Sequence, residues 1–289
     1  MYNLSKGDSV GIVASSNGIN INMKDKLEYL FNKLENMGLN IILSKYIYMK
    51  YSEYNGTGIE RAGEINRFFA DKSIKVIFDI SGGDLANEVL DYLDYKLIAE
   101  NPKGFFGYSD LSVILNAINS KANIVTYNYQ LRNLIGSFEK IQTTNFINTF
   151  FYNDGSLFNL DFQWIQGNEM AGKVVGGNIR CFLKLAGTKY MPDFNNKILL
   201  LESLNGNVAK IATALEQYKQ IGAFSNINGI ILGTFTEMER ENYDINVVDL
   251  VKKAINNDNL PIVKTKSIGH GQDAKCIAIG KEIMVRKND

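Results

Sequence analysis

The sequence Gly104-Phe105-Phe106-Gly107-Tyr108-Ser109-Asp110 carries an apolar run into a sharp polar turn. Residues 111–118 then repeat apolar side chains with the spacing of an amphipathic helix. A strand, a tight turn and a helix in this order can lift a serine hydroxyl off the end of a sheet and aim it at a substrate. Ser109 is therefore a candidate nucleophile. The alternative is a loop serine that caps the following helix, because serine and aspartate are favoured at that position.

Apolar strands and amphipathic helices alternate on both sides of this turn. In the first half, the pattern predicts strands over 9–16, 40–43, 74–80 and 123–127 and helices over 24–37, 59–70, 85–93 and 111–121. In the second half, it predicts a helix through Leu183 and Leu185, strands over 197–202, 227–233 and 261–263, helices over 208–221 and 245–256, and a closing hairpin over 276–285. Such alternation predicts parallel sheets covered on both faces, which bind ligands at the carboxyl ends of their strands.

The composition argues against several classes of protein. The chain of 289 residues has 31 basic and 31 acidic side chains, so no basic excess indicates a nucleic acid or an anionic membrane as a partner. Its two cysteines, Cys181 and Cys276, have neither the spacing of a disulfide framework nor that of a zinc site. Residues 1–8 lack the pattern of a secretory signal, and no apolar run reaches about 18 residues. We therefore expect a cytoplasmic enzyme or binding protein that uses no metal or cofactor.

A pair of glycines, Gly82 and Gly83, follows the predicted strand 74–80. Glycine lets backbone N–H groups approach a ligand closely, and that ligand can be an oxyanion or a phosphate. The phosphate interpretation is the weaker one, because this stretch has no Walker lysine and no complete G-x-G-x-x-G motif.

Two further residues complete a chemical set with Ser109. Glu202 ends the apolar strand 197–202, where an unpaired buried charge would be costly. His270 is the only histidine of the chain and lies between two glycines. A serine hydroxyl needs a base, imidazole suits that task near neutral pH, and a carboxylate can orient the imidazole. Each residue also has an ordinary interpretation, namely a solvated strand end for Glu202 and a hydrogen-bonded turn for His270.

The order serine, acid, histidine along the chain also occurs in α/β-hydrolases. Those enzymes are a poor match, because Leu111 stands where their nucleophile motif has its second glycine.

The sequence instead resembles the LD-carboxypeptidase family of serine peptidases, which includes muramoyl-tetrapeptide carboxypeptidases and microcin C7 self-immunity peptidases. The motifs that carry the resemblance follow one another in the right order over nearly the whole chain: Ser81-Gly82-Gly83, Asn101-Pro102-Lys103, Gly107-Tyr108-Ser109-Asp110, Gly176-Gly177-Asn178, Gly187-Thr188, Leu199-Leu200-Leu201-Glu202, Gly229-Ile230-Ile231-Leu232-Gly233 and Gly269-His270-Gly271.

The resemblance implies a catalytic triad of Ser109, Glu202 and His270, with the backbone N–H groups of Gly83 and Asp110 as the oxyanion hole. It also implies an α/β fold. An N-terminal, flavodoxin-like parallel-sheet domain would carry the nucleophile, and a smaller C-terminal α/β domain would carry the glutamate and the histidine, commonly in a cytoplasmic homodimer. We place the nucleophile domain at 1–145, a crossover segment at 146–170 and the C-terminal domain at 171–289.

The sequence departs from the family pattern in the region that helps to shape the substrate pocket. Asn128-Tyr129-Gln130 stands where the family often has His-Gly-Pro, and residues 131–164 match weakly, so the substrate stays open. The stretch from Ser81 to Glu88 is closer to the microcin-immunity branch. We predict a metal-independent serine peptidase that cleaves an amide bond in a murein tetrapeptide or in a peptidyl- or aminoacyl-nucleotide. The alternatives are a flavodoxin-like binding protein that holds an anionic ligand, and an esterase.

Overall fold

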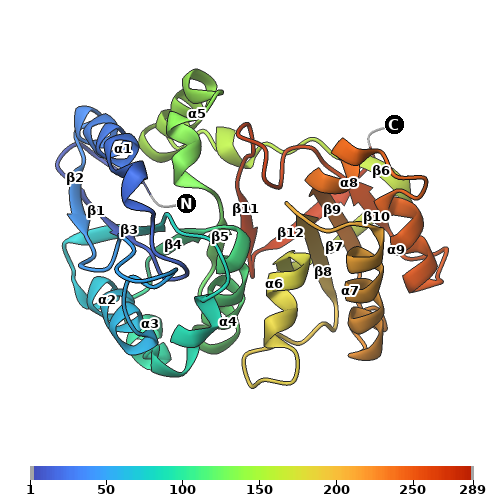
Figure 1. Ribbon diagram of the computed structural model, residues 1–289. Coiled ribbons are helices and arrows are strands. Elements are labelled where there is room, and N and C mark those ends of the chain that lie inside the picture. The colour runs from blue at the N-terminus through green and yellow to red at the C-terminus, as the bar shows by residue number, and fades with distance from the viewer. Residues whose placement is uncertain (1–2, 288–289) are drawn as a thin grey trace.

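Two six-stranded sheets lie side by side in the computed structural model, which describes residues 3–287 (Figure 1). Residues 1–2 of the predicted nucleophile domain and residues 288–289 of the predicted C-terminal domain lie outside the described residues. The first sheet consists, in spatial order, of β2 (Asn40–Leu43), β1 (Ser9–Val13), β3 (Ile74–Asp79), β4 (Gly104–Gly107), β5 (Thr126–Asn128) and β11 (Ile277–Ile279). All neighbours pair in parallel except β11, which is antiparallel to β5. The order β2-β1-β3-β4-β5 is the flavodoxin-like order, which confirms the predicted fold class.

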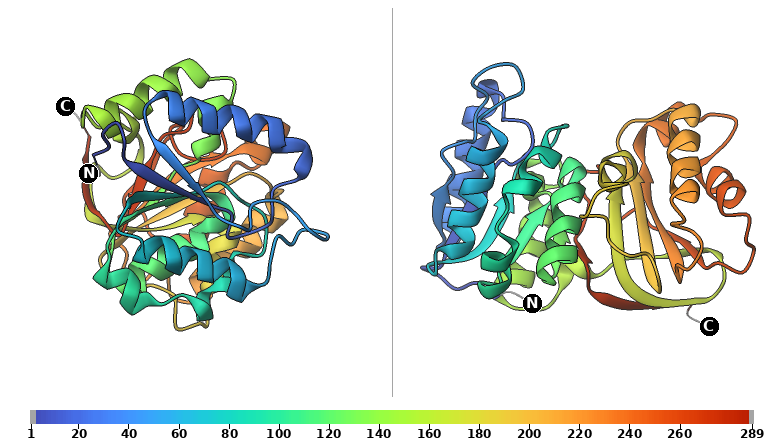
Figure 2. Two further views of the ribbon diagram at one scale, coloured as in Figure 1. Left: turned by 90° about the vertical axis from the view of Figure 1, so that its left-hand side faces the viewer. Right: turned by 90° about the horizontal axis from the view of Figure 1, so that it is seen from below.

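Helices cover both faces of this sheet (Figures 1 and 2). They are α1 (Lys24–Asn36), α2 (Gly58–Ala70), α3 (Tyr95–Glu100), α4 (Ser112–Ala122) and α5 (Glu139–Phe151), with short 3-10 helices η1 (Ile21–Met23), η2 (Ala86–Tyr92), η3 (Ser109–Leu111), η4 (Leu131–Ile135) and η5 (Ser156–Phe158). The pleat divides the strand side chains between two cores, so that Phe78 packs with Phe146 and Phe150 of α5 while Phe105 packs with Phe69 of α2.

The second sheet has the order β12 (Glu282–Arg286), β7 (Glu169–Asn178), β8 (Lys197–Ser203), β9 (Gly229–Phe235), β10 (Ile262–Lys264) and β6 (Gln163–Gln166). Its four central strands are parallel, and the strands at the two edges are antiparallel to their neighbours. The helices of this domain are α6 (Ile179–Phe182), η6 (Leu183–Leu185), α7 (Val208–Gln220), α8 (Thr236–Glu241) and α9 (Val247–Ile255). Among residues 3–287, no helix combines the length and the apolar character needed to cross a bilayer.

The predicted hairpin over 276–285 is wrong. Its two strands do not pair with each other, because β11 belongs to the first sheet and β12 to the second. Gly280, with a φ of 82°, turns the chain between them, and its N–H donates to the carbonyl of Val174 in β7 at 2.7 Å. Two short apolar runs around a glycine predict a turn but not the partner of each strand.

Two elements cross the predicted domain borders, since α5 runs through residue 145 and β7 runs through residue 170. Within the predicted crossover segment, β6 pairs with β10 and so belongs to the second sheet.

Candidate active site

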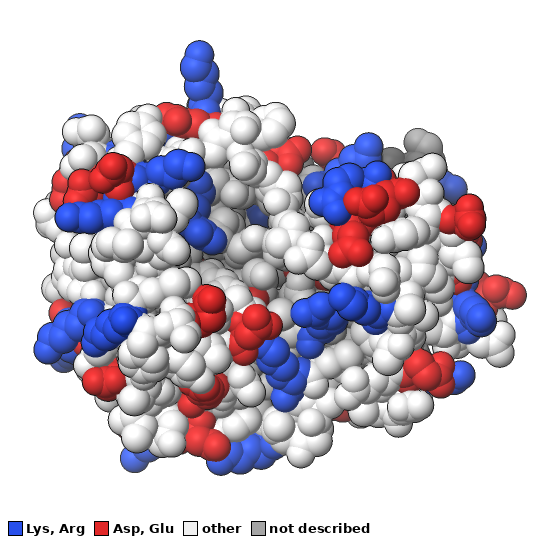
Figure 3. Space-filling view, viewed as in Figure 1, with Lys and Arg blue, Asp and Glu red and all other residues white. Residues whose placement is uncertain are grey.

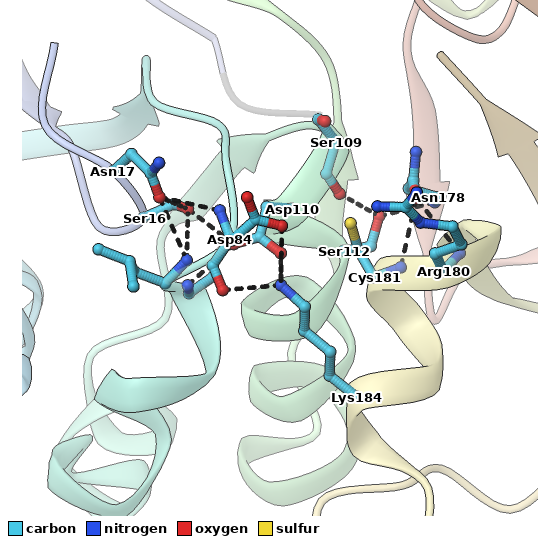
Figure 4. Close-up of polar contacts among 12 residues, drawn as sticks. Ser16, Asn17, Asp84, Ser109, Asp110, Ser112, Asn178, Arg180, Cys181 and Lys184 are labelled. Carbon is cyan, nitrogen blue, oxygen red and sulfur yellow. Dashed lines mark hydrogen bonds and ion pairs between the residues drawn. The ribbon is translucent and has the colours of Figure 1, made fainter. Parts of the chain in front are cut away.

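Ser109 lies in a strained turn between β4 and α4. Its φ is 59°, which is the left-handed region that side chains other than glycine rarely adopt. The carbonyl oxygen of Ser109 accepts a hydrogen bond from the Ser112 hydroxyl at 2.7 Å, which holds the turn (Figure 4). Gly107 before the turn is needed for space, because a Cβ there would lie 2.9 Å from the Cβ of Leu111. Backbone strain of this kind is characteristic of serine nucleophiles at the end of a strand.

The structure brings His270 and Glu202 together with Ser109. His270 Nε2 lies 3.0 Å from Ser109 Oγ, and His270 Nδ1 lies 2.6 Å from Glu202 Oε2. A carboxylate can only accept, so Nδ1 carries the proton toward Glu202 and Nε2 is free to accept from the serine hydroxyl. The three side chains therefore form the hydrogen-bonded chain that activates a serine.

The positions of the acid and the histidine follow from local backbone features. Glu202 is near the carboxyl end of β8, the strand end at which parallel sheets place their chemistry. His270 follows Gly269, whose φ of 138° requires glycine and at which a Cβ would overlap the Thr234 side chain of β9. The glycine thus lets the histidine turn pack directly on the second sheet, within reach of Glu202.

Glu202 and His270 are sealed from solvent. Each side chain is 1% exposed, and Glu202 Oε1 has no hydrogen-bond partner among the described residues. The buried carboxylate therefore depends on His270 for its only polar contact within residues 3–287. The ring of Tyr108 covers the imidazole at 4.6 Å between ring centroids. Burial, and then the charge of Glu202, raise the pKa of the Tyr108 phenol, so this ring is an uncharged wall of the site.

The paired glycines face the nucleophile. A Cβ placed on Gly82 would lie 3.9 Å from Ser109 Cβ, which puts this turn in contact with the serine. Gly83 has a φ of 121°, and a Cβ there would overlap the side chain of Asn17, so only glycine fits. Within residues 3–287, the Gly83 N–H donates to no protein group, which leaves it available to a ligand.

The carboxylate of Asp110 ties this turn to the nucleophile. Its side chain is fully buried and accepts from the Ser16 hydroxyl at 2.6 Å and from the Ala86 N–H at 2.9 Å. A third donor is Lys184 of η6, whose Nζ lies 2.6 Å from Asp110 Oδ1 and 2.8 Å from the carbonyl oxygen of Asp84 (Figure 4). The lysine thus reaches across from the second domain to the loop that carries Gly83.

The two domains also meet through backbone contacts beside the serine. Asn116 of α4 donates to the Gly176 carbonyl at 2.8 Å and accepts from the Gly176 N–H at 2.9 Å. Two residues further along β7, the Asn178 N–H donates to the hydroxyl of Ser112 in α4 at 2.9 Å. Figure 3 shows a hollow between the two lobes on the face seen in Figure 1. The relative position of the domains therefore sets the distance from Ser109 to His270.

Lys184, Asn116 and Ser112 also belong to this site and were not predicted from the sequence. Lys184 could have been found from the sequence, because it is the single charged residue in the apolar run from Cys181 to Ala186 and a charge in such a run needs a partner. Asn116 and Ser112 could not have been found in this way, because a polar residue in an amphipathic helix is expected on the side that faces solvent.

No cluster of three or more potential metal ligands occurs in the described part of the chain. The polar groups around Ser109 are a base, an acid and backbone N–H donors, and these are the groups that nucleophilic acyl transfer requires.

Comparison with known proteins identifies relatives over the whole length. A family model for the LD-carboxypeptidase N-terminal domain matches residues 10–129, and one for the LD-carboxypeptidase C-terminal domain matches residues 171–285. A putative carboxypeptidase of Treponema pallidum is 28% identical, covering 98% of this chain and 90% of its own. A probable murein peptide carboxypeptidase of Bacillus subtilis is 25% identical, covering 96% of this chain and 88% of its own.

The microcin C7 self-immunity protein MccF of Escherichia coli is 24% identical, covering 98% of this chain and 91% of its own. A solved structure of MccF in complex with aspartyl sulfamoyl adenosine has the same fold, with a TM-score of 0.86 at 21% identity over 99% of this chain and 95% of that chain. The two domain matches, in the order of the two sheets, establish that the chain belongs to the LD-carboxypeptidase family and is a serine-type carboxypeptidase.

Proposed function

We propose that the protein hydrolyses an amide bond of a small peptide or peptide conjugate, with Ser109, His270 and Glu202 as its catalytic triad. The observation that carries the proposal is the position of His270, which lies 3.0 Å from a serine in a strained turn and 2.6 Å from a buried carboxylate. Ser109 attacks the carbonyl carbon, and His270 takes its proton and passes it to the leaving amine. Glu202 keeps the imidazole in the required tautomer and stabilises the imidazolium. Water then releases the acyl group by the same route.

The oxyanion that forms during attack needs donors on the side of the carbonyl away from His270. We assign this role to the backbone N–H groups of Gly83 and Asp110. The proposal is supported by the contact between Gly82 and Ser109 and by the absence of a protein acceptor, within residues 3–287, for the Gly83 N–H. One such donor contributes about 3 kcal/mol to transition-state stabilisation in comparable sites.

Two substrate classes remain for this site. The relation to MccF, which has been solved with aspartyl sulfamoyl adenosine, supports an aminoacyl- or peptidyl-nucleotide. The relation to a probable murein peptide carboxypeptidase supports a murein tetrapeptide, with release of its terminal D-alanine. The sequence of the glycine turn favours the first. The resemblance further implies a cytoplasmic homodimer, and light scattering of the purified protein would test the dimer.

The decisive experiment compares the wild type with Ser109→Ala on a murein tetrapeptide and on a peptidyl-adenylate analogue, with the products identified by mass. Ser225→Ala, an exposed serine on a loop, is the matched control. We expect Ser109→Ala to retain its fold and to lose turnover by several orders of magnitude, and Ser225→Ala to match the wild type. A chelator should leave the rate unchanged. Unchanged hydrolysis by Ser109→Ala would refute the triad.

The two other interpretations have less support. Membership of a family of serine carboxypeptidases disfavours a binding protein without catalysis. An esterase would show turnover of ester but not amide analogues in the same assay.

A further inference from the structure

Arg132 is a cation without a partner close to the candidate nucleophile. Arg61 and Arg132 are the two arginines in residues 3–287 that are not exposed. Arg61 donates to the carbonyl oxygens of Ser15, Ser16 and Leu85 and pairs with Glu88. The side chain of Arg132 makes no hydrogen bond and no ion pair within the described residues, and its Nε is sealed from solvent without an acceptor. The two guanidinium groups therefore differ, since Arg61 is buried and bonded to the fold whereas the partly buried Arg132 has no protein partner within residues 3–287.

The backbone places Arg132 at the edge of the active site. Arg132 belongs to η4, which follows β5, and Asn128 of β5 is paired in register with Gly107, two residues before Ser109. On its other side, η4 is attached to the loop that follows His270, because Asn133 donates to the Ala274 carbonyl at 3.4 Å. The residue is thus held between the nucleophile turn and the histidine turn.

Tyr108 connects the arginine to the catalytic groups. The tyrosine precedes Ser109 and packs on the His270 ring, and the charge of Arg132 acts on its phenol. Burial lowers the pKa of the Arg132 guanidinium, and the nearby Tyr108 and Asp79 oppose this only in part. Asp79 makes no hydrogen bond or ion pair with Arg132, and its carboxylate accepts instead from the Ser15 N–H and from the N–H and hydroxyl of Ser81.

Even a partly buried cation without a partner is costly, and it is tolerated where an anionic ligand pairs with it. We propose that Arg132 binds a carboxylate of the substrate next to the amide bond that Ser109 attacks. This proposal rests on the proposed function and further specifies that the substrate carries a negative charge beside the scissile bond. A guanidinium suits this task, since its planar fork binds a carboxylate through two hydrogen bonds.

Two kinds of substrate carboxylate meet this requirement. In a peptide, the terminal carboxylate of the leaving residue is separated from the scissile carbonyl only by the amide nitrogen and one Cα. In an aminoacyl conjugate, the side-chain carboxylate of an aspartyl group lies on the acyl side. Both present the same chemistry to Arg132, so the experiment must separate them.

The kinetic test uses pairs of substrates that differ only in charge. One pair is a peptide ending in D-alanine and its C-terminal amide, and the other is an aspartyl- and an asparaginyl-adenylate analogue with a cleavable amide. We expect Arg132→Gln to lower kcat/KM for the anionic member of one pair by about 10- to 100-fold and to change the neutral member little, with Arg132→Lys in between. The affected pair identifies the carboxylate. Arg240→Gln, an exposed arginine paired with Glu241, is the control.

A stability measurement separates binding from a structural role. Removing a partly buried charge that has no protein partner should leave the melting temperature of Arg132→Gln equal to or above that of the wild type. A fall in activity together with a fall in stability, and an equal loss on anionic and neutral substrates, would overturn the proposal.

A binding measurement keeps the inference testable if no substrate is turned over. Calorimetry on Ser109→Ala protein should show tighter binding of aspartyl sulfamoyl adenosine than of its asparaginyl counterpart, or of a D-alanine-terminated peptide than of its amide. Ser109→Ala/Arg132→Gln should lose this preference. If Ser109→Ala shows no preference for either anionic probe, Arg132 is not a carboxylate site. If the preference is present but the wild type hydrolyses neither substrate, the proposed function fails and the binding site stands.

Discussion

The contact between Lys184 and Asp110 allows a quantitative test of how the two domains cooperate. Lys184→Met keeps most of the length and the apolar stem of the side chain but removes one of the three donors to a fully buried carboxylate. Breaking a buried ion pair costs about 3–5 kcal/mol. Lys184 is 24% exposed and Asp110 keeps Ser16 and Ala86, so we discount this to about 2 kcal/mol. For a chain of this size, the melting temperature should fall by roughly 4–8 °C.

The same substitution should also affect the reaction. The Asp110 N–H is a proposed oxyanion donor, and Lys184 also holds the Asp84 carbonyl at 2.8 Å, one residue after Gly83. Loosening this loop should lower kcat by about tenfold and change KM little, because the affected interaction forms only in the transition state.

A double-mutant cycle with Asp110→Asn measures the contact directly. The double variant leaves no uncompensated charge, so we expect a coupling energy of about 1–2 kcal/mol in thermal or denaturant unfolding. Lys189→Met is the matched control, since this exposed lysine pairs with Asp91 at 3.0 Å in the same segment and should leave the melting temperature unchanged. A coupling energy below about 0.5 kcal/mol would show that the pair is independent and would refute the reasoning.

Three further outcomes follow from the geometry. Ser109→Gly should be more stable than Ser109→Ala by about 1 kcal/mol in denaturant unfolding, because glycine removes the strain of a φ of 59°; equal stability would mean that the turn is unstrained. His270→Ala should lower kcat/KM by several orders of magnitude, since its Nε2 lies 3.0 Å from Ser109 Oγ and accepts the serine proton, and a variant that keeps the wild-type rate would exclude His270 as the base. Burial raises the pKa of both Cys181 and Cys276, so a thiol reagent at pH 8–9 should label the native protein negligibly and the unfolded protein at both cysteines; rapid native labelling would contradict their burial.

The fold and the triad residues could be predicted because their signals are local. Near Ser109 and Glu202, an apolar run of a few residues predicts a buried strand. The polar residue directly after or at the end of that run predicts a functional side chain at the strand end. The parallel order followed from the alternation of strands and helices. The single histidine left one candidate for the base, and the structure places it between the two others.

The features that the sequence analysis missed depend on contacts between distant parts of the chain. Lys184 contacts Asp110 from another domain, and the lack of a hydrogen-bond partner for Arg132 Nε can be seen only when all of its neighbours are known. The end of the chain was misjudged for the same reason, since the apolar pattern of β11 and β12 gives no information about which sheet each strand joins. Pairing between remote segments is a property of the whole fold and not of a window of sequence.

The separation of β11 from β12 has a consequence for biosynthesis. The outer edge of β5 is completed by β11, which the ribosome makes about 150 residues later than β5, or on the order of 10 s at usual rates of elongation. Until then, the nascent first sheet presents an open strand edge that other chains could pair with. The second sheet waits for β12 at the same moment. Both sheets are therefore completed together as the last strands emerge, so an interrupted translation product would have neither sheet complete and would be a natural target for chaperones.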